Sequence, residues 1–290
     1  MRIVAIMPVR NEDWCLGFTA RALLRWVDHL VILDHASTDN TKRIASDIAL
    51  QHVGRVRLLE DSNPVWREMH QRQWLLTEAR AIGATHIAIV DADEIVTANL
   101  LADIRAMFAT IKPGEVLQLP WLCLRSLDTV HTSGVWGEQN ASTGFLDDPI
   151  WHWSAEGLGG YDHHHRHPMG RTAIPFQPLG GRRHAGLIHL QFVSERRLLA
   201  KQFWYQLVER TRWPDKFTAA EIRAKYSLTV HAHQARAGTL APAKWLNGYE
   251  DILSHLHINR EPWQLAEARR IIAENPGIEV GLNDFGVLQS

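Results

Sequence analysis

Residues 87–94 read Ile-Ala-Ile-Val-Asp-Ala-Asp-Glu, an apolar run that passes without a break into three closely spaced carboxylates. An uninterrupted run rich in β-branched residues is typical of a strand buried on both faces, as in a parallel sheet covered by helices. Carboxylates that follow such a strand lie at the edge where open α/β sheets bind ligands. Asp91 and Asp93 can therefore both face a hard cation and the phosphate oxygens that it bridges. The alternative is that these acids cap the next helix.

The composition is that of an ordinary globular protein: 290 residues, 46% hydrophobic and 22% charged, with a formal net charge of -1. A net charge near zero argues against a nucleic-acid-binding protein that relies on a basic surface. Cys15 and Cys123 support neither a disulfide framework nor a thiolate zinc site, which favours a reducing compartment. No stretch approaches the ~20 apolar residues that cross a bilayer, and residues 1–7 lack a signal-peptide pattern. We expect a cytoplasmic protein without a transmembrane segment, and peripheral membrane association stays open.

The first hundred residues alternate between strand and helix patterns. Strands are predicted at residues 3–7, 30–33, 56–59 and 87–90. Helices are predicted at 14–26, from the loop 34–41 through about 51, and from Asn63-Pro64 to Gly83, with Asn63 as cap and Pro64 at the first helical position. Strands that alternate with helices of this length indicate βαβ units. The predicted fold is therefore α/β, with a Rossmann-like, mainly parallel sheet flanked by helices.

Three motifs stand at the ends of predicted strands. They are Pro8-Val9-Arg10-Asn11-Glu12, then Val31-Ile32-Leu33-Asp34 with Ser37-Thr38-Asp39-Asn40-Thr41, then Asp91-Ala92-Asp93-Glu94. In this order they resemble family 2 glycosyltransferases of the GT-A fold. The resemblance covers about residues 1 to 110 and is weaker near His189. The resemblance implies a nucleotide-sugar donor, a divalent metal (Mn²⁺ or Mg²⁺), a hydroxyl acceptor on a glycan or glycolipid, and usually inversion of the anomeric centre.

The resemblance also implies roles for individual residues. Asp91 and Asp93 would form the metal-binding DxD motif, with Asp34 beside the donor's base or ribose, and the nucleotide-sugar site would include Pro8, Arg10, Asn11 and Ala92. His35 stands where many members carry a second Asp that reads uracil. Because a neutral imidazole can either donate or accept a hydrogen bond, the donor base stays open. Arg67 is a candidate nucleotide contact, and a solvated helix face is its alternative interpretation.

The middle of the chain is less regular. A helix is predicted at 98–111 and a strand at 116–122, whereas residues 125–186 have few periodic segments. Long irregular stretches in compact domains tend to be functional, and the resemblance implies that this stretch is the acceptor region. Candidate platforms for sugar rings in the middle of the chain are Trp121, Trp136, Trp151 and Trp153, although aromatic residues are more often core. His189 ends an apolar segment, and the resemblance implies that it completes the metal site with Asp91 and Asp93. Such an oxygen-plus-imidazole set suits manganese, and a core histidine is the alternative.

A histidine run, His163-His164-His165-Arg166-His167, lies between Gly157 and Gly170. Adjacent histidines do not match zinc spacings, so the run is expected to contact acceptor or phosphate. The density of glycine predicts that residues 157–170 are mobile in the free protein and order over the donor, with Arg166 meeting the diphosphate. Asp162 and Glu156 are the candidate general bases, and Asp147 and Asp148 stay open.

The C-terminal part is predicted to be helical. Ser194 can cap a helix that runs through Arg210, and two further helices are expected at 218–236 and 262–274. Lys201 on the first helix is a candidate for binding the donor pyrophosphate, and a charged solvent face is the alternative. The expected organisation is a nucleotide-sugar half at 1–120, an acceptor and metal-completing half at 121–215, and a helical extension at 216–290.

Three other functions remain compatible with these patterns. A nucleotidyltransferase would also join a Rossmann-like sheet to a metal and phosphates, but no glycine-rich phosphate loop follows the first strand. A non-catalytic carbohydrate-binding protein would keep the tryptophans without needing the DxD motif. A hydrolase with the same carboxylates would consume nucleotide-sugar without an acceptor.

Overall fold

The structure is a computed structural model that describes residues 1–134, 136–153, 166–168, 170–235, 238–278, 286 and 288. The chain divides into two compact units. The first comprises Met1–Leu122, Glu138–His189 and Pro242–His257, and the second comprises Cys123–Gly137, Leu190–Ala241 and Ile258–Ser290. Each unit is described here by itself. The predicted division into donor, acceptor and extension parts remains a prediction, because compactness does not say which part binds which substrate.

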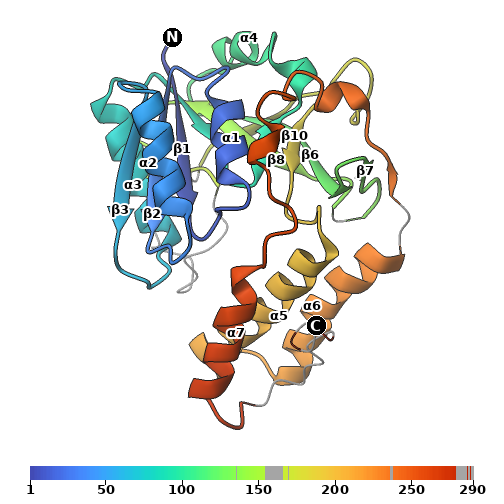
Figure 1. The fold of residues 1–290 in the computed structure, drawn as a ribbon. Coiled ribbons are helices and arrows are strands. Elements are labelled where there is room, and N and C mark those ends of the chain that lie inside the picture. The colour runs from blue at the N-terminus through green and yellow to red at the C-terminus, as the bar shows by residue number, and fades with distance from the viewer. Residues whose placement is uncertain are drawn as a thin grey trace. The chain divides into compact units, whose positions relative to one another are not determined.

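The first unit is built on a mostly parallel sheet flanked by helices, as predicted (Figure 1). Its main strands follow the order β6-β8-β4-β1-β2-β3, in which β3, β2, β1 and β4 are parallel and β8 is antiparallel to both its neighbours. Their bounds are β1 Ile3–Val9, β2 His29–His35, β3 Val56–Asp61, β4 His86–Ile89, β6 Glu115–Ser126 and β8 Asn140–Leu146. Three shorter strands complete it: β9 Thr172–Pro175 pairs with β6 in parallel, and β10 Leu187–His189 pairs with β5 Glu94–Val96.

Helices cover both faces of this sheet because alternate strand residues point to opposite sides. One face packs against α1 Leu16–Leu23, α2 Thr41–Gln51 and α4 Ile104–Ala109, and the other against α3 Glu68–Ala81. Along β4, Ala88 belongs to the first of these cores, while Ile87 and Ile89 belong to the second. The apolar run thus forms a strand buried on both faces, and its carboxyl end carries Asp91 and Asp93 to one edge of the sheet. Short 3₁₀ turns lie at Ala98–Leu100, Ala243–Trp245 and Leu253–His255.

The second unit is mainly helical, as the C-terminal pattern predicted. It contains α5 Glu195–Arg212, α6 Ala219–Ala235 and α7 Trp263–Glu274, and its two short strands, β7 Thr129–Val130 and β11 Thr239–Leu240, pair with each other. Phe203 and Leu207 of α5 form a small core with Ala268 and Ile271 of α7. The buried Arg197 guanidinium donates hydrogen bonds to the carbonyls of Ile258 and Arg260, which ties α5 to the segment before α7.

Several predicted elements differ from the structure. The helix expected from Asn63-Pro64 begins only at Glu68, because the Asn63 side chain accepts a hydrogen bond from the Val65 N–H and forms a local turn instead of a helix cap. The helix expected at 98–111 is a 3₁₀ turn followed by the short α4. The stretch expected to be irregular contains strand β8. Gly144 lies within this strand, and no larger residue fits there because a Cβ atom would lie 2.3 Å from the Phe108 ring.

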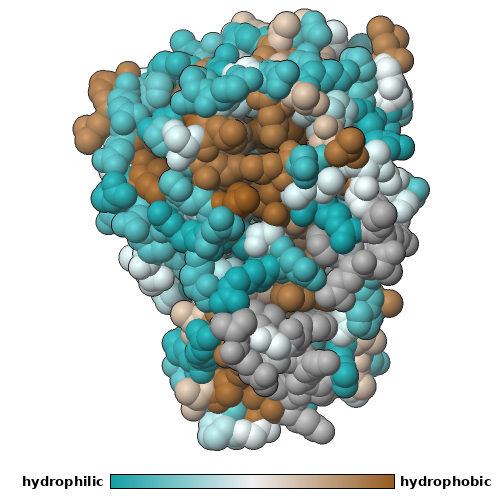
Figure 2. All heavy atoms as spheres, turned by 45° about the vertical axis from the view of Figure 1, so that its right-hand side comes forward, coloured by the Kyte–Doolittle hydropathy of each residue, from teal (hydrophilic) through white to brown (hydrophobic). Residues whose placement is uncertain are grey.

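The surface carries both hydrophobic and hydrophilic side chains. On the face displayed in Figure 2, hydrophobic side chains gather in one area of the upper part and hydrophilic side chains surround it. Partly buried hydrophobic residues such as Met107 and Phe176 pack against the core of the first unit. Of the helices within the described ranges, none is long and apolar enough to cross a membrane.

Candidate active site

Two loops at the carboxyl edge of the sheet hold the backbone in an unusual conformation. Asn11 follows β1 with a φ of 55° and Ala36 follows β2 with a φ of 48°, and no other non-glycine residue in the described parts of the chain has a positive φ. The Asn11 Oδ1 atom accepts a hydrogen bond from the Thr38 N–H (2.7 Å), and the Asn11 N–H donates to the Ser37 hydroxyl (2.9 Å). These two hydrogen bonds join the loops and hold both backbones in place. Backbone strain held in this way is typical of functional sites.

Asp34 and His35, at the end of β2, are both buried and both have an unused acceptor. Asp34 Oδ2 accepts from the Ser37 N–H (3.3 Å), whereas Oδ1 has no hydrogen-bond partner among the described residues. His35 Nε2 lies 2.8 Å from the carbonyl oxygen of Asn63 and 3.2 Å from that of Val65, so this nitrogen carries the proton. Nδ1 is then an acceptor, and it too is buried without a partner in the part of the chain that the structure describes. Burial, and secondarily Arg10, lower the pKa of His35 and keep the ring neutral.

The other predicted nucleotide contacts gather near the loop after β3. The Arg10 guanidinium donates to the carbonyl of Pro64 (2.8 Å), and the partly exposed Arg67 pairs with Asp61 at 3.5 Å. This is the loop whose carbonyl oxygens hold His35. The chain therefore brings two cations and two buried acceptors together where the resemblance expects the nucleotide.

Three further residues that were predicted to contact the nucleotide-sugar, Pro8, Ala92 and Lys201, do not belong to the loop after β3. Pro8 is paired within the sheet, opposite Leu33. The carbonyl of the buried Ala92 accepts a hydrogen bond from the Thr19 hydroxyl (2.7 Å), so its backbone faces α1. Lys201 belongs to the second unit, where its ammonium lies 5.9 Å from the centre of the Tyr205 ring. Its role toward a pyrophosphate remains a prediction.

Asp91 lies within a chain of alternating charges. Arg166 Nη1 contacts Asp91 Oδ2 at 2.6 Å, and Arg166 Nη2 contacts Glu94 Oε2 at 2.7 Å. On the other side, Arg72 Nη2 contacts Asp91 Oδ1 at 3.2 Å and Glu68 Oε1 at 2.8 Å. Arg166, which the sequence led us to expect at the donor diphosphate, is thus held by the protein's own carboxylates.

These ion pairs shift the pKa values of their members. Burial alone would raise the pKa of Asp91, but Arg166 and Arg72 together bring it below its ordinary value. Burial alone would lower the pKa of Arg166, but Asp91 and Glu94 raise it. The charge of Asp93 also acts on Asp91 and on Arg166, so among the described residues four carboxylates and two guanidinium groups make up this cluster.

Asp93 and His189 form the pair that best fits a divalent cation. His189 lies opposite Glu94 in the β10–β5 ladder, and its Nε2 is 3.2 Å from Asp93 Oδ2. Neighbouring ligands of an octahedral ion with bonds of about 2.1 Å lie about 3 Å apart, so the observed spacing suits such an ion. The ring of Trp121 stacks on His189 (4.5 Å between centres, 18° between planes) and donates through Nε1 to Glu94 (3.0 Å). No set of three Asp, Glu, His or Cys side chains in the described ranges is arranged to hold a metal.

The candidate bases Asp162 and Glu156 lie outside the described residues, as do His163–His165 and most of the segment predicted to order over the donor. The tryptophans proposed as sugar platforms have protein partners. Trp121 stacks on His189, and the buried Trp153 packs against Phe145 in the core. Trp151 lies below the Arg171 guanidinium, and Trp136 packs against Phe192 in the second unit.

Asp147 and Asp148 lie at the opposite, amino edge of the sheet, because Asp147 donates its N–H to the carbonyl of Thr85, just before β4. Arg80 holds the Asp147 carboxylate through two contacts of 2.9 Å. These acids therefore lie at the edge of the sheet opposite the DxD motif, a position that disfavours either of them as the general base.

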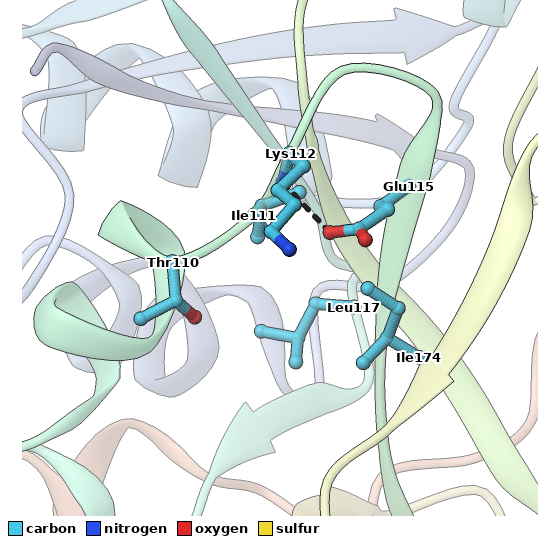
Figure 3. Close-up of a pocket in the computed structure, with 6 residues that line it drawn as sticks. All are labelled: Thr110, Ile111, Lys112, Glu115, Leu117 and Ile174. Carbon is cyan, nitrogen blue, oxygen red and sulfur yellow. Dashed lines mark hydrogen bonds between the residues drawn. The ribbon is translucent and has the colours of Figure 1, made fainter.

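A pocket of about 280 Å³ lies at the same amino edge (Figure 3). It is lined by Thr110, Ile111, Lys112, Glu115, Leu117 and Ile174. In the sheet, Leu117 pairs with Gly144, which in turn pairs with Ala88, three residues before Asp91. At about 3.3 Å per residue, Asp91 is roughly 10 Å further along the strand direction, so this pocket is separate from the DxD site.

The sequence analysis did not assign roles to Arg72 and Glu94. Arg72 shares one helical stripe with the buried Leu75, Leu76 and Ala79, and a charge on an apolar stripe is a signal of a buried ion pair. Glu94 was visible as the third carboxylate of the motif, but nothing in the sequence distinguishes a fully buried acid from an exposed helix cap.

One family model and several solved structures are similar to this chain. The model of the family described as "Glycosyl transferase family 2" matches residues 4–118. No curated protein matches the chain. Among solved structures, the chain is similar to S. aureus TarS 1–349 in complex with UDP, with 12% identity, 82% of this chain and 73% of that chain covered, and a TM-score of 0.47.

A second solved structure is the mannosyltransferase PcManGT from Pyrobaculum calidifontis in complex with GDP-Man and Mn²⁺ (18% identity, 94% of this chain and 74% of that chain, TM-score 0.46). A third is glucosyl-3-phosphoglycerate synthase from Mycobacterium tuberculosis in complex with Mn²⁺, UDP and phosphoglyceric acid (18%, 42% and 43%, TM-score 0.29). The family match covers β1 to β4 and the loops that follow them, whereas Arg166 and His189 lie outside the matched residues. In residues 4–118 the chain is similar to glycosyl transferase family 2, and the protein is a glycosyltransferase.

Proposed function

We propose that the protein transfers a sugar from a nucleotide-sugar to a hydroxyl group of a glycan or glycolipid, with a divalent cation and with inversion of the anomeric centre. One observation carries this proposal: Asp93 Oδ2 and His189 Nε2 lie 3.2 Å apart, at the edge of the sheet where Asp91 and Glu94 also lie. This pair of ligands suits a divalent cation. When bound there, the cation would stabilise the charge that develops on the departing nucleoside diphosphate.

The chain's own residues would bind the nucleotide next to this cluster. Asp34 Oδ1 and His35 Nδ1 are buried acceptors that no described protein group satisfies, and buried acceptors of this kind are normally hydrogen-bonded. Donors on a ribose or a base are suited to fill them. Arg10 and Arg67, near the same loop, supply positive charge for a phosphate. We leave the base and the sugar unassigned.

The acceptor hydroxyl must lose a proton as it attacks the anomeric carbon, and a carboxylate is the group that we expect to take it. Asp162 and Glu156 remain the proposed candidates. Their roles are separable by mutation, because Asp162→Asn or Glu156→Gln at the base position lowers the transfer rate without weakening nucleotide binding.

The test begins with binding. We expect UDP or GDP to raise the melting temperature of the protein in the presence of Mn²⁺, and less so with a chelator, because an oxygen-plus-imidazole site suits manganese. A panel of nucleotide-sugars then identifies the donor. Asp93→Asn should lose the metal-dependent part of the shift, whereas Asp147→Asn, at the opposite edge of the sheet, should keep it.

The reaction products distinguish a glycosyltransferase from a hydrolase and from a nucleotidyltransferase. Glycosyl transfer requires that nucleoside diphosphate release rise with an added acceptor, and a hydrolase would release it at the same rate without one. A nucleotidyltransferase would release pyrophosphate from a nucleoside triphosphate. The absence of any metal-dependent nucleotide binding would contradict the proposal and favour a carbohydrate-binding protein.

A further inference from the structure

Thr19 of α1 and Cys15, which directly precedes this helix, both donate a hydrogen bond to one carbonyl oxygen in the DxD motif. The Thr19 hydroxyl lies 2.7 Å from the carbonyl oxygen of Ala92, and the Cys15 thiol lies 3.2 Å from the same atom. Thr19 and Cys15 are 0% exposed, and Ala92 is 4% exposed. Two buried donors about one helical turn apart therefore converge on the carbonyl in the middle of the motif.

The protons of both donors point toward this carbonyl. A hydroxyl has a single proton, and a threonine inside a helix often donates it to the carbonyl four residues earlier. For Thr19 that carbonyl belongs to Cys15 and lies 3.2 Å away, and the carbonyl of Leu16 lies 3.5 Å away. The Cys15 thiol lies 3.5 Å from Oε2 of Glu12 and 3.8 Å from its carbonyl oxygen. Because the Ala92 oxygen is the nearest acceptor for each group, both of its lone pairs are engaged.

Ala92 and Asp93 are the central residues of a turn. The N–H of Glu94 donates to the carbonyl of Asp91 (3.0 Å), and the N–H of Asp91 donates to Glu94 Oε2 (3.0 Å), so the ends of the turn are closed. Type I and type II turns differ in the orientation of the peptide unit between the two central residues. A type II turn needs a positive φ at its third residue, and Asp93 does not have one. The hydroxyl and the thiol hold the peptide unit in the observed orientation, and because that unit is planar they also fix the backbone bond that leads to Asp93.

We propose that Thr19, assisted by Cys15, is a positioning residue for the transfer reaction. Through the Ala92 carbonyl it sets the orientation of the central peptide of the turn, and with it the direction of the Asp93 carboxylate. Both residues act through the backbone, since neither side chain is exposed. The inference rests on the proposed function, in which Asp93 acts beside the departing nucleoside diphosphate.

The first experiment removes the hydroxyl while keeping the shape of the side chain. In Thr19→Val, Mn²⁺ should bind roughly 10-fold more weakly in the absence of donor, as is typical when a supporting group around a metal site is lost. The electron paramagnetic resonance signal of free Mn²⁺ gives this affinity. The kcat for sugar transfer should fall by a similar factor because Asp93 is misplaced, whereas UDP or GDP affinity without Mn²⁺ should not change. Thr19→Ser should stay within about threefold of the wild type, because it keeps the donor.

The second experiment tests the thiol. An S–H group is the weaker donor, so Cys15→Ala should reduce kcat and Mn²⁺ affinity by only about twofold to threefold. Thr19→Val combined with Cys15→Ala should lose more than the product of the two single effects, because either donor alone still holds the carbonyl. The matched control is Thr77→Val in α3. The Thr77 hydroxyl donates to the carbonyl of Gln73 within the same helix (3.0 Å), so this variant should keep the kcat and the Mn²⁺ affinity of the wild type.

A purely structural Thr19 gives a different pattern. Thr19→Val would then melt at a lower temperature, with Mn²⁺ affinity and kcat per folded molecule as in the wild type, and this result would overturn the inference. Equal impairment of Thr19→Ser and Thr19→Val would overturn it too, because packing and not the hydroxyl would then be responsible.

Two further outcomes complete the test. If Thr19→Val does not fold, Cys15→Ala decides, and wild-type Mn²⁺ affinity and kcat in that variant would overturn the inference. A wild-type protein that bound no Mn²⁺ even with UDP or GDP, or an Asp93→Asn variant with wild-type turnover, would instead contradict the proposed function, and this inference would fall with it.

Discussion

The two edges of the mostly parallel sheet both carry clusters of charged side chains, but the clusters differ in composition. At the amino edge, Asp147 and Asp148 face Arg80 and Arg171, so two acids meet two cations. Arg80 holds Asp147 with two hydrogen bonds of 2.9 Å, while burial lowers the pKa of Arg171 to about 10. At the carboxyl edge, four acids meet two guanidinium groups.

The backbone and the unsatisfied polar atoms also differ between the two edges. The positive φ angles of Asn11 and Ala36 and the unsatisfied acceptors of Asp34 and His35 all lie at the carboxyl edge. At the amino edge the unsatisfied atoms of the Arg80 and Arg171 cluster are donors, Nε and Nη2 of Arg171. Strained loops beside unused acceptors are unfavourable until a ligand binds, which is typical of a functional site. Backbone strain therefore separates the two edges better than the number of acids does.

The largest expected effect is at Asp93. Asp93→Asn should lower the rate of sugar transfer at least ~100-fold, because it removes negative charge from the site that stabilises the leaving group. The fold should survive, since the substitution keeps the side-chain shape. The measurement is nucleoside diphosphate release at saturating donor, together with a melting curve. Turnover of Asp93→Asn at the wild-type rate would contradict a role for Asp93 in the reaction. Failure of this variant to fold would show that Asp93 has a structural role instead.

The matched substitution at the amino edge should have the reverse outcome. Asp147→Asn leaves Arg80 without its ionic partner, and because this pair is only partly buried, the expected loss in the free energy of unfolding is about 2 kcal/mol. Transfer per folded molecule should stay within about twofold of the wild type, since no part of the site lies there. Urea unfolding and kinetics on the same preparation test both statements. A large loss of activity without loss of stability would contradict the comparison of the two edges.

A smaller effect is expected at His189. His189→Ala should raise the Mn²⁺ concentration needed for half-maximal activity roughly tenfold, with little change in the metal-free melting temperature. Titration of activity with Mn²⁺ measures the first quantity. If the melting temperature fell strongly while the metal dependence stayed the same, His189 would be a core histidine that packs against Trp121.

The smallest effect concerns pH. Burial lowers the pKa of His35 at the carboxyl edge and of His86 at the amino edge, so the unfolded chain binds their protons first as pH falls. The stability that each neutral ring contributes is complete above a pH of about 6.5 and is lost as pH falls toward the folded-state pKa. The change in the free energy of unfolding with pH corresponds to the uptake of at most one proton by each ring. His86→Asn should therefore reduce this pH dependence.

Nucleotide affinity distinguishes the two histidines. Protonation of His35 removes its Nδ1 acceptor, so UDP or GDP affinity should fall over the same pH range in the wild type and in His86→Asn alike. Isothermal titration from about pH 8 to pH 5 is the measurement. An affinity that stays constant down to the lower limit would exclude Nδ1 as a nucleotide contact.

The sequence predicted most of the first unit because its signals are local. Apolar runs and capping residues lie within a few positions of one another, so the first four strands, the helices between them and the position of Asp91 and Asp93 follow from the order of residues. The resemblance carried by the three motifs at strand ends pointed to the same family whose model matches residues 4–118. Strand β8 was missed because Asn140, Ser142 and Gly144 read as loop residues, although packing against Phe108 favours Gly144 there.

The sequence by itself determined the first four strands of the sheet and the edge that carries Asp91 and Asp93. The tertiary structure alone decided which charges meet there. Arg166 reaches Asp91 across 75 residues and Arg72 reaches it across 19, and no periodicity links such partners. Strand and helix patterns arise from backbone geometry that repeats every two to four residues, whereas an ion pair between distant segments depends on how the whole chain packs. The arrangement of charges at the carboxyl edge is therefore a property of the fold.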